Sequence, residues 1–440
     1  MFQTFRNAWK IDDLRKKIIF TLIILFIFRL GAAIVVPFID ASVLATSLNT
    51  EGTIFGFFDL MTGGGFSQAT LFALGVTPYI NASIIIQLLQ VVIPALERWS
   101  KEGEDGRRKL NNLTRYSAIG IALVLASIYY LLVKRQGALM YTDGFAGIFT
   151  AFVIIGCFTA GAVLLMWLGE QIDSKGIGNG ISLLIFTGII AGLVNAFAQI
   201  VTYFKAAAGT LVQGGVAQPA QPMFYWLVPL IILMFAGMFV LIVTVTAAER
   251  RIPVQYAKRV VGRKMYGGQS TNIPIKVNMT GVLPVIFASA FLSVPGTIRD
   301  FFGIYTGFWG TVLGWFKTSG WAYAVIYALL IMGFNFFYVA VQYNPVQMAN
   351  DLRKNSGTIP GIRPGRSTSD FIARVVSKIT FIGGVFLILV ATLPILIANI
   401  TGINIALGGT SVLIVVGVAL EISNTLESYM LMRHHKGFLE

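Results

Sequence analysis

Two glycine-rich motifs are the places where this sequence could bind a nucleotide. Gly176-Ile177-Gly178-Asn179-Gly180 has part of the spacing of a dinucleotide fingerprint, but it lies between two apolar runs and does not follow a strand. The segment from Gly361 to Thr368 superficially resembles a phosphate-binding loop, yet its glycines are too closely spaced and Arg366 stands where a lysine is required. Neither motif fits its chemistry. We therefore expect no nucleotide site and no enzymatic activity.

Residues that carry acid–base, metal or redox chemistry are also scarce. The single cysteine, Cys157, lies inside an apolar run, and the only two histidines, His434 and His435, are adjacent near the C-terminus. One thiol cannot form a disulfide within the chain, and an adjacent histidine pair is more typical of a solvated tail than of a metal site. We expect no catalytic residue, no metal and no cofactor.

Two apolar pairs have a spacing that could line a pathway. Val76 and Ile80 are four residues apart, as are Ile181 and Ile185, so each pair places two branched side chains on one face of a helix. Such pairs usually face lipid or a protein core. Here polar residues such as Asn81 adjoin them, which indicates a hydrated or protein-facing interior, because polar side chains are costly against hydrocarbon. An apolar constriction in such an interior prevents leakage by excluding water.

The elements that would position these pairs are membrane-spanning helices. Of the 440 residues, 56% are hydrophobic and 12% are charged, and the mean hydropathy is +0.77, whereas about a quarter of a soluble protein is charged. Continuous apolar runs favour helices over a barrel, so we expect an all-α integral membrane protein. The ten predicted transmembrane helices, each long enough for a bilayer core of roughly 30 Å, are 18–36, 74–94, 114–132, 148–168, 181–203, 224–247, 280–298, 321–341, 379–397 and 407–425.

The positions of the cations give these spans a direction. The formal net charge is +14, and 27 of the 33 lysines and arginines lie in the two terminal segments and in every second connection, whereas five lie in the other connections. Arg29, inside the first span, is the remaining one. The positive-inside rule then places both termini in the cytosol, which requires an even number of spans. No cleavable signal peptide is predicted, because the first run is long and no small-residue cleavage site follows it.

A repeated motif divides the chain into two halves. The stretches Gly75 to Ser83 and Gly281 to Ser289 agree at six of nine positions and open the second and seventh spans. Because each half has five spans, the second half would be inverted relative to the first, a plan common in membrane transport proteins. We predict an N-terminal half at 1–205 and a C-terminal half at 206–440. Chance similarity between small and apolar residues is the alternative explanation of the repeat.

Inverted repeats also occur in ion-coupled secondary transporters, which are the alternative function. Such a transporter normally places acidic residues or histidines deep in the membrane. Almost none are present here, and Glu421 lies toward the cytosolic end of the last span. Arg29 fits a snorkelling or helix-paired structural role. A pathway without charged ligands suits a substrate whose chemical groups vary from one molecule to the next.

Several long motifs are distributed along the chain. They are Gly75-Val76-Thr77-Pro78-Tyr79-Ile80-Asn81-Ala82-Ser83-Ile84-Ile85-Ile86-Gln87-Leu88, Glu102-Gly103-Glu104-Asp105-Gly106-Arg107-Arg108-Lys109, Met166-Trp167-Leu168-Gly169-Glu170-Gln171-Ile172, Gly176-Ile177-Gly178-Asn179-Gly180-Ile181-Ser182, Pro360-Gly361-Ile362-Arg363-Pro364-Gly365 and Gly408-Gly409-Thr410-Ser411. These motifs resemble the SecY family, the channel subunit of the bacterial translocon, and the resemblance runs from the first span to the last.

This resemblance implies two inverted five-helix halves around an hourglass pore, which is closed by a short re-entrant plug helix at about 57–70. The second and seventh helices would form a lateral gate. The implied pore ring is Val76, Ile80, Ile181, Ile185, Ile286 and Ile414, with Val76 in place of the more usual isoleucine. The implied plug residues are Phe57, Phe58, Leu60, Met61, Gly63, Gly64, Gly65 and Phe66, and the gate residues are Pro78, Asn81, Gln87, Asn278 and Pro284.

The large basic connections at 248–278 and 344–376 are the remaining candidates for function. Anionic lipid would attract any basic loop, but two prolines and two glycines between Ile359 and Gly365 predict a shaped turn suited to docking a partner. The resemblance implies docking of the ribosome or the SecA motor ATPase, with SecE and SecG as partner subunits, signal peptides and nascent polypeptides as clients, and location in the bacterial plasma membrane in contact with membrane lipids. The implied docking residues are Arg250, Arg251, Lys258, Arg259, Arg263, Lys264, Arg363 and Arg366.

Overall fold

A computed structural model gives the fold of the chain. It describes residues 6, 8–47, 54–209, 212–213, 216–217, 222–256, 259–261, 264–266, 270–302, 307–316, 320–401 and 408–436. Each of the ten predicted spans corresponds to a helix in this structure, so the mostly helical membrane fold is confirmed. These helices are α2 (Asp12–Gly31), α5 (Thr77–Val92), α7 (Glu104–Arg135), α8 (Gly144–Lys175), α9 (Gly180–Ala207), α10 (Phe224–Ala247), α11 (Leu283–Phe302), α13 (Trp321–Gln342), α15 (Arg366–Thr401) and α16 (Gly409–Lys436).

Seven of the helices within the described ranges are individually long and apolar enough to cross a membrane. The other three, α2, α5 and α11, differ from this pattern for visible reasons. The α2 helix carries charged residues in its first turns. The α5 helix ends before Pro94, where the chain bends by 101° into α6 (Pro94–Lys101). The apolar part of α11 is only Leu283–Gly296.

Two helices extend well beyond the apolar runs that predicted them. The α15 helix has 36 residues, which at 1.5 Å per residue makes it about 54 Å long, whereas a bilayer core is roughly 30 Å thick. Its first 13 residues precede the predicted span and include three cations. The α7 helix likewise begins ten residues before its predicted span. Hydropathy therefore located the spans but underestimated the lengths of the helices, because a helix can continue into water as a polar segment that hydropathy does not detect.

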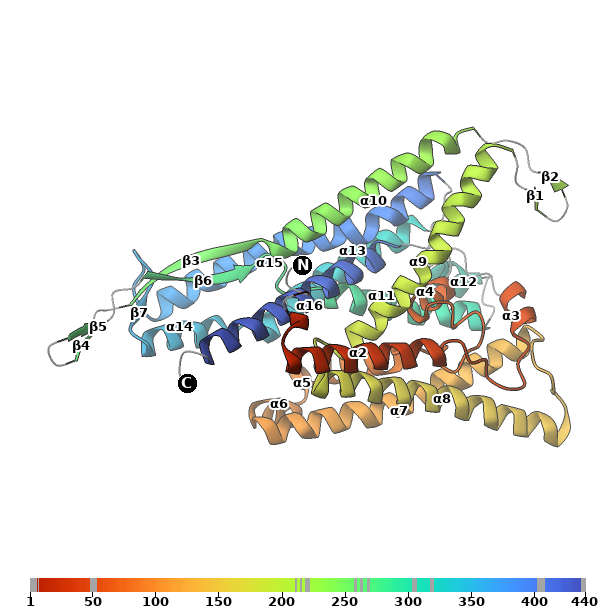
Figure 1. Ribbon diagram of the computed structural model, residues 1–440, viewed down its shortest axis with the longest axis horizontal. Helices are drawn as coiled ribbons and strands as arrows, with labels where there is room; N and C mark the ends of the chain where they lie inside the picture. Colours follow the sequence, from red (N-terminus) through yellow and green to blue (C-terminus); the bar gives the residue numbers. More distant parts are fainter. Residues whose placement is uncertain are drawn as a thin grey trace.

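The helices form two groups that follow the order of the chain (Figure 1). One group contains α2, α5, α7 and α8, and the other contains α10, α13, α15 and α16. The α9 helix joins them, because it packs against α2 and α8 on one side and against α10 and α16 on the other. Four short helices complete the description: α3 (Ala41–Ser47), α4 (Ile54–Thr62), α12 (Gly307–Gly314) and α14 (Pro345–Lys354).

The connection between α10 and α11 is a β-hairpin, a feature that the sequence analysis did not anticipate. Strands β3 (Glu249–Tyr256) and β6 (Ser270–Lys276) pair antiparallel, with Ile252 opposite Ile273. Strand β7 (Gly357–Thr358) adds to the other side of β3. The remaining strands, which form two-stranded antiparallel pairs, are β1 (Val212–Gln213) with β2 (Val216–Ala217), and β4 (Arg259–Val261) with β5 (Lys264–Tyr266).

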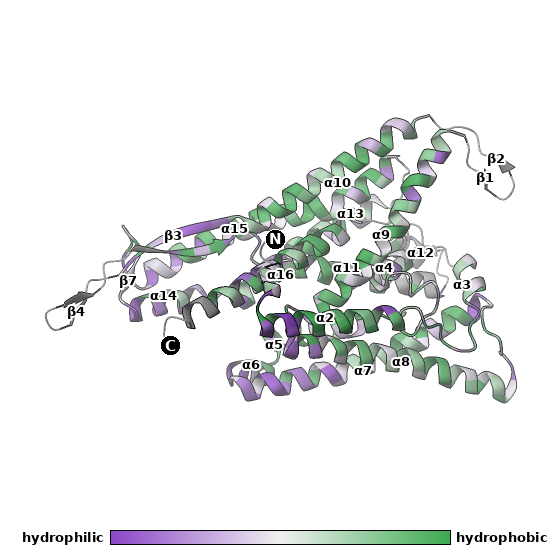
Figure 2. Ribbon diagram, in the orientation of Figure 1, coloured by the Kyte–Doolittle hydropathy of each residue, from purple (hydrophilic) through white to green (hydrophobic). Residues whose placement is uncertain are grey.

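Polar residues gather at one end of the molecule. In Figure 2 the hydrophilic colour concentrates on β3, α14, α6 and the first turns of α7, whereas the long helices are mostly apolar between their ends. Many large apolar side chains on these helices are exposed, among them Phe152, Leu233 and Leu329. An apolar girdle between polar ends is the surface that a bilayer requires.

Candidate functional site

The two copies of the repeated motif adopt the same local structure. Gly75 and Gly281 have φ angles of +57° and +63°, and a helix begins two residues after each of them, at Thr77 and Leu283. Glycine is required there because other residues rarely adopt a positive φ. Pro78 and Pro284 then lie in the first turns of α5 and α11, where the missing N–H group is not needed. The sequence repeat is therefore also a structural repeat at the entry to both helices.

The six predicted ring residues lie in one hydrophobic cluster. Four helices supply them: α5 (whose N-cap is Val76), α9, α11 and α16. Five of the six are buried, and Ile181 is half-buried at the edge of the cluster. The cluster is larger than the predicted ring, and it includes a predicted plug residue. Met61 from α4 packs into the cluster, and Val282, which is equivalent to Val76 in the repeat, packs against it.

Local packing fixes where α9 and α16 place their ring residues. Asn179 caps α9 by accepting a hydrogen bond from the Ser182 amide at 3.0 Å. At Gly180 an added Cβ would lie 2.0 Å from the carbonyl oxygen of Gly169, so α8 and α9 meet backbone to backbone. At Gly409 a Cβ would similarly lie 1.9 Å from the Val390 oxygen. The Gly176–Gly180 motif, rejected above as a nucleotide site, is thus the turn that sets α9 in place.

The helix in the predicted plug segment is shorter than the expected range of about 57–70, and it begins before residue 57. The α4 helix covers Ile54–Thr62, and the glycine triplet that follows it is a turn. Gly63 and Gly64 have φ angles of +67° and +89°, which end the helix because only glycine adopts them easily. Phe58 is half-buried, while Met61, Gly65 and Phe66 are buried. The side chains of the predicted plug residues Phe57 and Leu60 lie outside the described residues.

The turn after α4 is fastened to the N-terminal group of helices. The hydroxyl of Tyr129, on α7, donates a hydrogen bond to the carbonyl of Phe66, and the two rings pack edge to face at 4.8 Å. Asp59 accepts a hydrogen bond from the Ser67 amide at 2.7 Å, which folds the turn back onto α4. The α4 helix itself packs on α9 and touches α11. It therefore lies at the junction between the two groups of helices, beside the apolar cluster.

The predicted gate helices α5 and α11 are in contact. Pro78 and Pro284 are buried near the start of each helix, and Asn81 is half-buried. Gln87 donates a hydrogen bond to the Ser83 hydroxyl at 3.2 Å within α5. Asn278 is buried in the segment between β6 and α11, and among the described residues its Oδ1 atom has no hydrogen-bond partner. The five predicted gate residues are thus spread over two helices and one connection.

The two basic connections form one folded unit. Strand β3 belongs to the first connection and β7 to the second, and Gln255 pairs with Thr358 between them. Ile252 and Val254 from β3 pack with residues of α14 and α15 in a separate hydrophobic cluster. The exposed docking candidates on this unit are Arg250, Arg251, Arg363 and Arg366. Lys258 and Arg263 lie outside the described residues, as do the side chains of Arg259 and Lys264 on β4 and β5.

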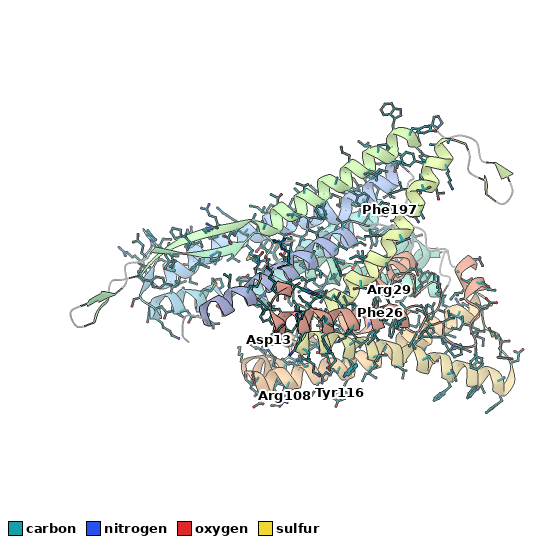
Figure 3. The ribbon with its side chains drawn as sticks, viewed as in Figure 1. Asp13, Phe26, Arg29, Arg108, Tyr116 and Phe197 are labelled. Carbon is teal, nitrogen blue, oxygen red and sulfur yellow. The ribbon has the colours of Figure 1, made fainter. Side chains whose placement is uncertain are left out.

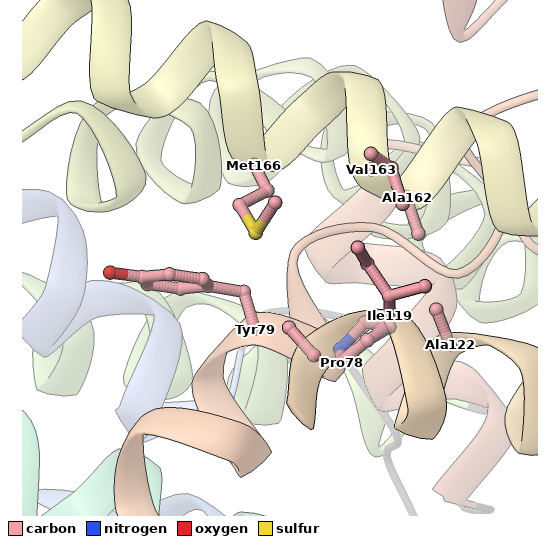
Figure 4. Close-up of a pocket in the computed structure, with 8 residues that line it drawn as sticks. Pro78, Tyr79, Ile119, Ala122, Ala162, Val163 and Met166 are labelled. Atoms are coloured by element: carbon pink, nitrogen blue, oxygen red, sulfur yellow. The ribbon is translucent and has the colours of Figure 1, made fainter. Parts of the chain in front are cut away.

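A small pocket lies behind α5, between α5, α7 and α8 (Figure 4). The residues that line it are apolar apart from Tyr79, whose hydroxyl points away from the others, and Ala118, Ala122 and Ala162 allow the three helices to approach closely. Met166 projects into the same space. Apolar walls with a single phenol offer neither a nucleophile with its base nor a metal ligand set, so this pocket does not suggest a catalytic centre.

Comparisons with known proteins agree with this architecture. A model of the SecY family matches residues 70–423. The protein translocase subunit SecY of Bacillus licheniformis is 41% identical over 450 residues, and the match covers 100% of both chains. The fold is similar to that of a solved SecY structure concerned with the plug domain and the closed state of the translocation channel. That likeness has a TM-score of 0.65 and 20% identity, and it covers 94% of this chain and 92% of the other.

A second solved structure, canine Sec61 in a ribosome–channel complex from the endoplasmic reticulum, has a TM-score of 0.58 and 18% identity, with 94% of this chain and 92% of that one covered. At such identities these two structures support the fold alone. The full-length relative and the family model go further, since they match this chain at the level of sequence. The chain belongs to the SecY family.

Proposed function

We propose that this chain forms a channel that conducts unfolded secretory polypeptides across a membrane and releases transmembrane segments sideways into it. The observation that carries this proposal is the convergence of the six ring residues and Met61 of α4 in one apolar cluster at the junction of the two helix groups. A ring of branched apolar side chains excludes water and ions by dewetting, yet it deforms around a chain of any sequence. The family's established role in protein translocation supports the same reading.

The proposed channel has two exits: one through the ring, which the plug closes, and one between the gate helices. In the proposal, α4 and the glycine turn after it block the ring in the resting state and move aside when a polypeptide enters. Separation of α5 from α11 would then open a path to lipid between them. A sufficiently apolar segment would leave by that path, because each buried CH₂ group gains about 0.8 kcal/mol on transfer from water.

The folded basic unit is the proposed docking surface for cytosolic partners. Its exposed arginines on β3 and around the turn before α15 suit an acidic partner such as ribosomal RNA, or the SecA motor ATPase. Complexes of a related channel with the ribosome, such as that of canine Sec61, support the ribosome as a partner. We further propose that SecE and SecG subunits assemble with this chain, and that signal peptides and nascent polypeptides are its clients.

The proposed orientation follows from the cations. With the basic unit and both termini in the cytosol, the chain obeys the positive-inside rule. The proposed location is the plasma membrane of a bacterium, with the apolar girdle in contact with lipid. An ion-coupled transporter is not favoured, because the chain belongs to a family of translocation channels.

The proposal is tested by replacing the six ring residues with serine and measuring ion leakage from vesicles that contain the whole complex. We expect leakage to rise well above that of the wild-type channel, since hydroxyl groups stabilise water in the constriction. The matched control replaces the same six residues with leucine, which keeps the ring apolar and should keep it sealed. Equal leakage from the serine and leucine variants would show that this cluster is not the seal.

A further inference from the structure

Arg29 is a charged residue in the wall behind the plug. It lies in the last turn of α2, where α2, α4 and α9 meet (Figure 3), and apolar residues surround it in the sequence. Its Nη1 atom is buried and has no hydrogen-bond partner among the residues that the structure describes. The Arg29 side chain as a whole is half-buried. Leaving a charged donor unpaired at a buried position is costly, because the protein does not replace the hydrogen bonds that water would make.

The plug covers this nitrogen. A Cβ atom added at Gly63 would lie 2.6 Å from Arg29 Nη1, 3.0 Å from the Gly188 carbonyl oxygen and 3.2 Å from the Cβ of Ala191. Nη1 is therefore confined between the turn that ends α4 and the middle of α9. If α4 moved away, one side of this enclosure would leave with it, and the guanidinium would gain space for water. The burial of Nη1 therefore depends on α4 staying in this position, which the proposed function takes as the closed arrangement.

Two effects of opposite sign act on the closed arrangement. The guanidinium stands near the C-terminal end of α4, where the helix dipole attracts a cation. The unpaired donor opposes closure, and in the proposal its cost exceeds the attraction that a single short helix supplies, because the dipole effect is small and no hydrogen bond accompanies it. The packing of Met61 and Phe66 described above holds the plug in place against this cost. The difference between the packing energy and the cost of the unpaired donor determines how readily the plug leaves.

We propose that Arg29 is a trapped cation that favours release of the plug, so that the closed channel lies near its opening threshold. This inference rests on the proposed function of α4 as a plug. It assigns Arg29 a positioning role in gating, different from the snorkelling or helix-paired role that its sequence position indicates. A signal peptide then needs to supply only part of the free energy of opening, because hydration of the guanidinium supplies another part.

The test replaces Arg29 with methionine, which has a similar length and no charge. We expect the ratio of open to closed channels to fall about tenfold, which corresponds to about 1.4 kcal/mol. The measurements are ion leakage through vesicles that contain the intact complex, and the rate at which export begins for a client with a weakened signal peptide. Both should decrease. Arg29→Lys keeps a charged donor and should stay close to wild type.

Two further variants keep the test decisive. Gly188→Ala should displace the plug and raise leakage, so Arg29→Met in that background should lower a leak that is large enough to measure accurately. Leu30→Met is the matched control, because Leu30 adjoins Arg29 on α2 and is 51% exposed. It should change neither leakage nor export. If Arg29→Met fails to assemble, Arg29→Leu takes its place with the same expectation.

The outcomes separate this inference from the plug assignment. Higher leakage with Arg29→Met would mean that Arg29 holds the plug closed, and unchanged leakage in both backgrounds would mean that it has no part in gating. Either result overturns the inference. If Gly188→Ala itself leaks no more than wild type, the plug assignment is wrong and the inference falls with it. A leak with Gly188→Ala that Arg29→Met does not reduce overturns the inference alone.

Discussion

The carbonyl oxygen of Met61, near the end of α4, lies directly against Gly188 in the middle of α9. A Cβ atom at position 188 would stand only 2.0 Å from that oxygen, a separation that non-bonded atoms do not reach. The close approach is possible only because residue 188 is glycine. The position of α4 beside the ring therefore depends on one missing methyl group on another helix, 127 residues away in the sequence.

The variant Gly188→Ala tests this relationship. We expect the added methyl group to displace α4 from α9. This should destabilise the closed state by about 1–3 kcal/mol, the usual effect of overpacking an interior. Ion leakage through reconstituted complexes should rise accordingly, by about 5- to 150-fold in the open-to-closed ratio. Gly156→Ala is the control, since a Cβ at Gly156 on α8 has no neighbour within 4 Å among the described residues. Equal leakage from both variants would show that the contact between Gly188 and the Met61 carbonyl does not hold α4 in place.

The second prediction concerns the hydrogen bond that the Tyr129 hydroxyl donates to the Phe66 carbonyl. In Tyr129→Phe this buried carbonyl loses its donor, which we expect to cost about 1–3 kcal/mol. The midpoint of thermal unfolding should fall, and amide hydrogens in the turn after α4 should exchange faster. Tyr116→Phe on the same helix is the control, because Tyr116 is 72% exposed and points outward (Figure 3). Unchanged exchange in Tyr129→Phe would mean that the hydroxyl does not fasten the turn.

A buried polar network fixes the entry to α11. The hydroxyl of Thr280 donates to Asn335 Oδ1 on α13 at 2.8 Å, and Asn335 Nδ2 donates to the Thr380 carbonyl on α15 at 2.8 Å. In Asn335→Val both bonds are lost, and we expect a destabilisation of about 1–3 kcal/mol, read as a lower midpoint of thermal unfolding. Thr380→Val is the control, because the Thr380 hydroxyl donates its hydrogen bond to the Val376 carbonyl within α15 and not to Asn335. A control as damaging as Asn335→Val would argue against the network.

The fourth prediction concerns docking at Arg363. Its side chain is exposed, while its backbone carbonyl accepts a hydrogen bond from the Thr368 hydroxyl at 2.9 Å, so a change of side chain leaves the turn intact. We expect Arg363→Glu to reduce motor-driven export at least tenfold, with normal assembly, and more strongly at low salt, where charge repulsion is less screened. Arg374→Glu, an exposed position further along α15, should have little effect. Undiminished export in Arg363→Glu would remove this docking role.

Much of the fold follows from the sequence because lipid imposes a simple rule. A run of apolar residues must become a helix, so all ten spans could be placed from composition alone. The ring residues came from the family motifs, and their role stays a prediction, although the structure places all six in one apolar cluster. The repeat of Gly75 and Gly281 worked because the positive φ angles of these glycines precede both helices and are a strictly local requirement.

The hairpin of β3 and β6 was missed although its pattern is visible afterwards. Ile252 and Val254 alternate with exposed residues along β3, as a half-buried strand should, but Pro253 and Pro274 argue against central strands. The structure resolves this conflict, because β7 pairs with Gln255 and Tyr256 at the end of β3, and within the described strands Pro253 has no partner on that side.

The features that position α4, the proposed plug, could not be found in the sequence. Gly188 looks like any small residue in an apolar helix, and nothing local connects it to Met61. Arg29 is visible in the sequence as an isolated charge, but its enclosure by Gly63 and Gly188 depends on three segments that meet only in the folded chain. Contacts of this kind follow from tertiary packing, and a local pattern does not predict them.

The central claim is that a polypeptide passes through the ring of six apolar residues, and cross-linking tests it most directly. A photoreactive amino acid would be placed at Ile80 or Ile286, and at the lipid-facing positions Ile148 and Leu233, which are each 71% exposed. A client stalled partway through export is then irradiated in the intact complex. We predict adducts with the client at both ring positions and none at the lipid-facing ones. Absence of adducts at the ring, or equal adducts at all four positions, would contradict the claim.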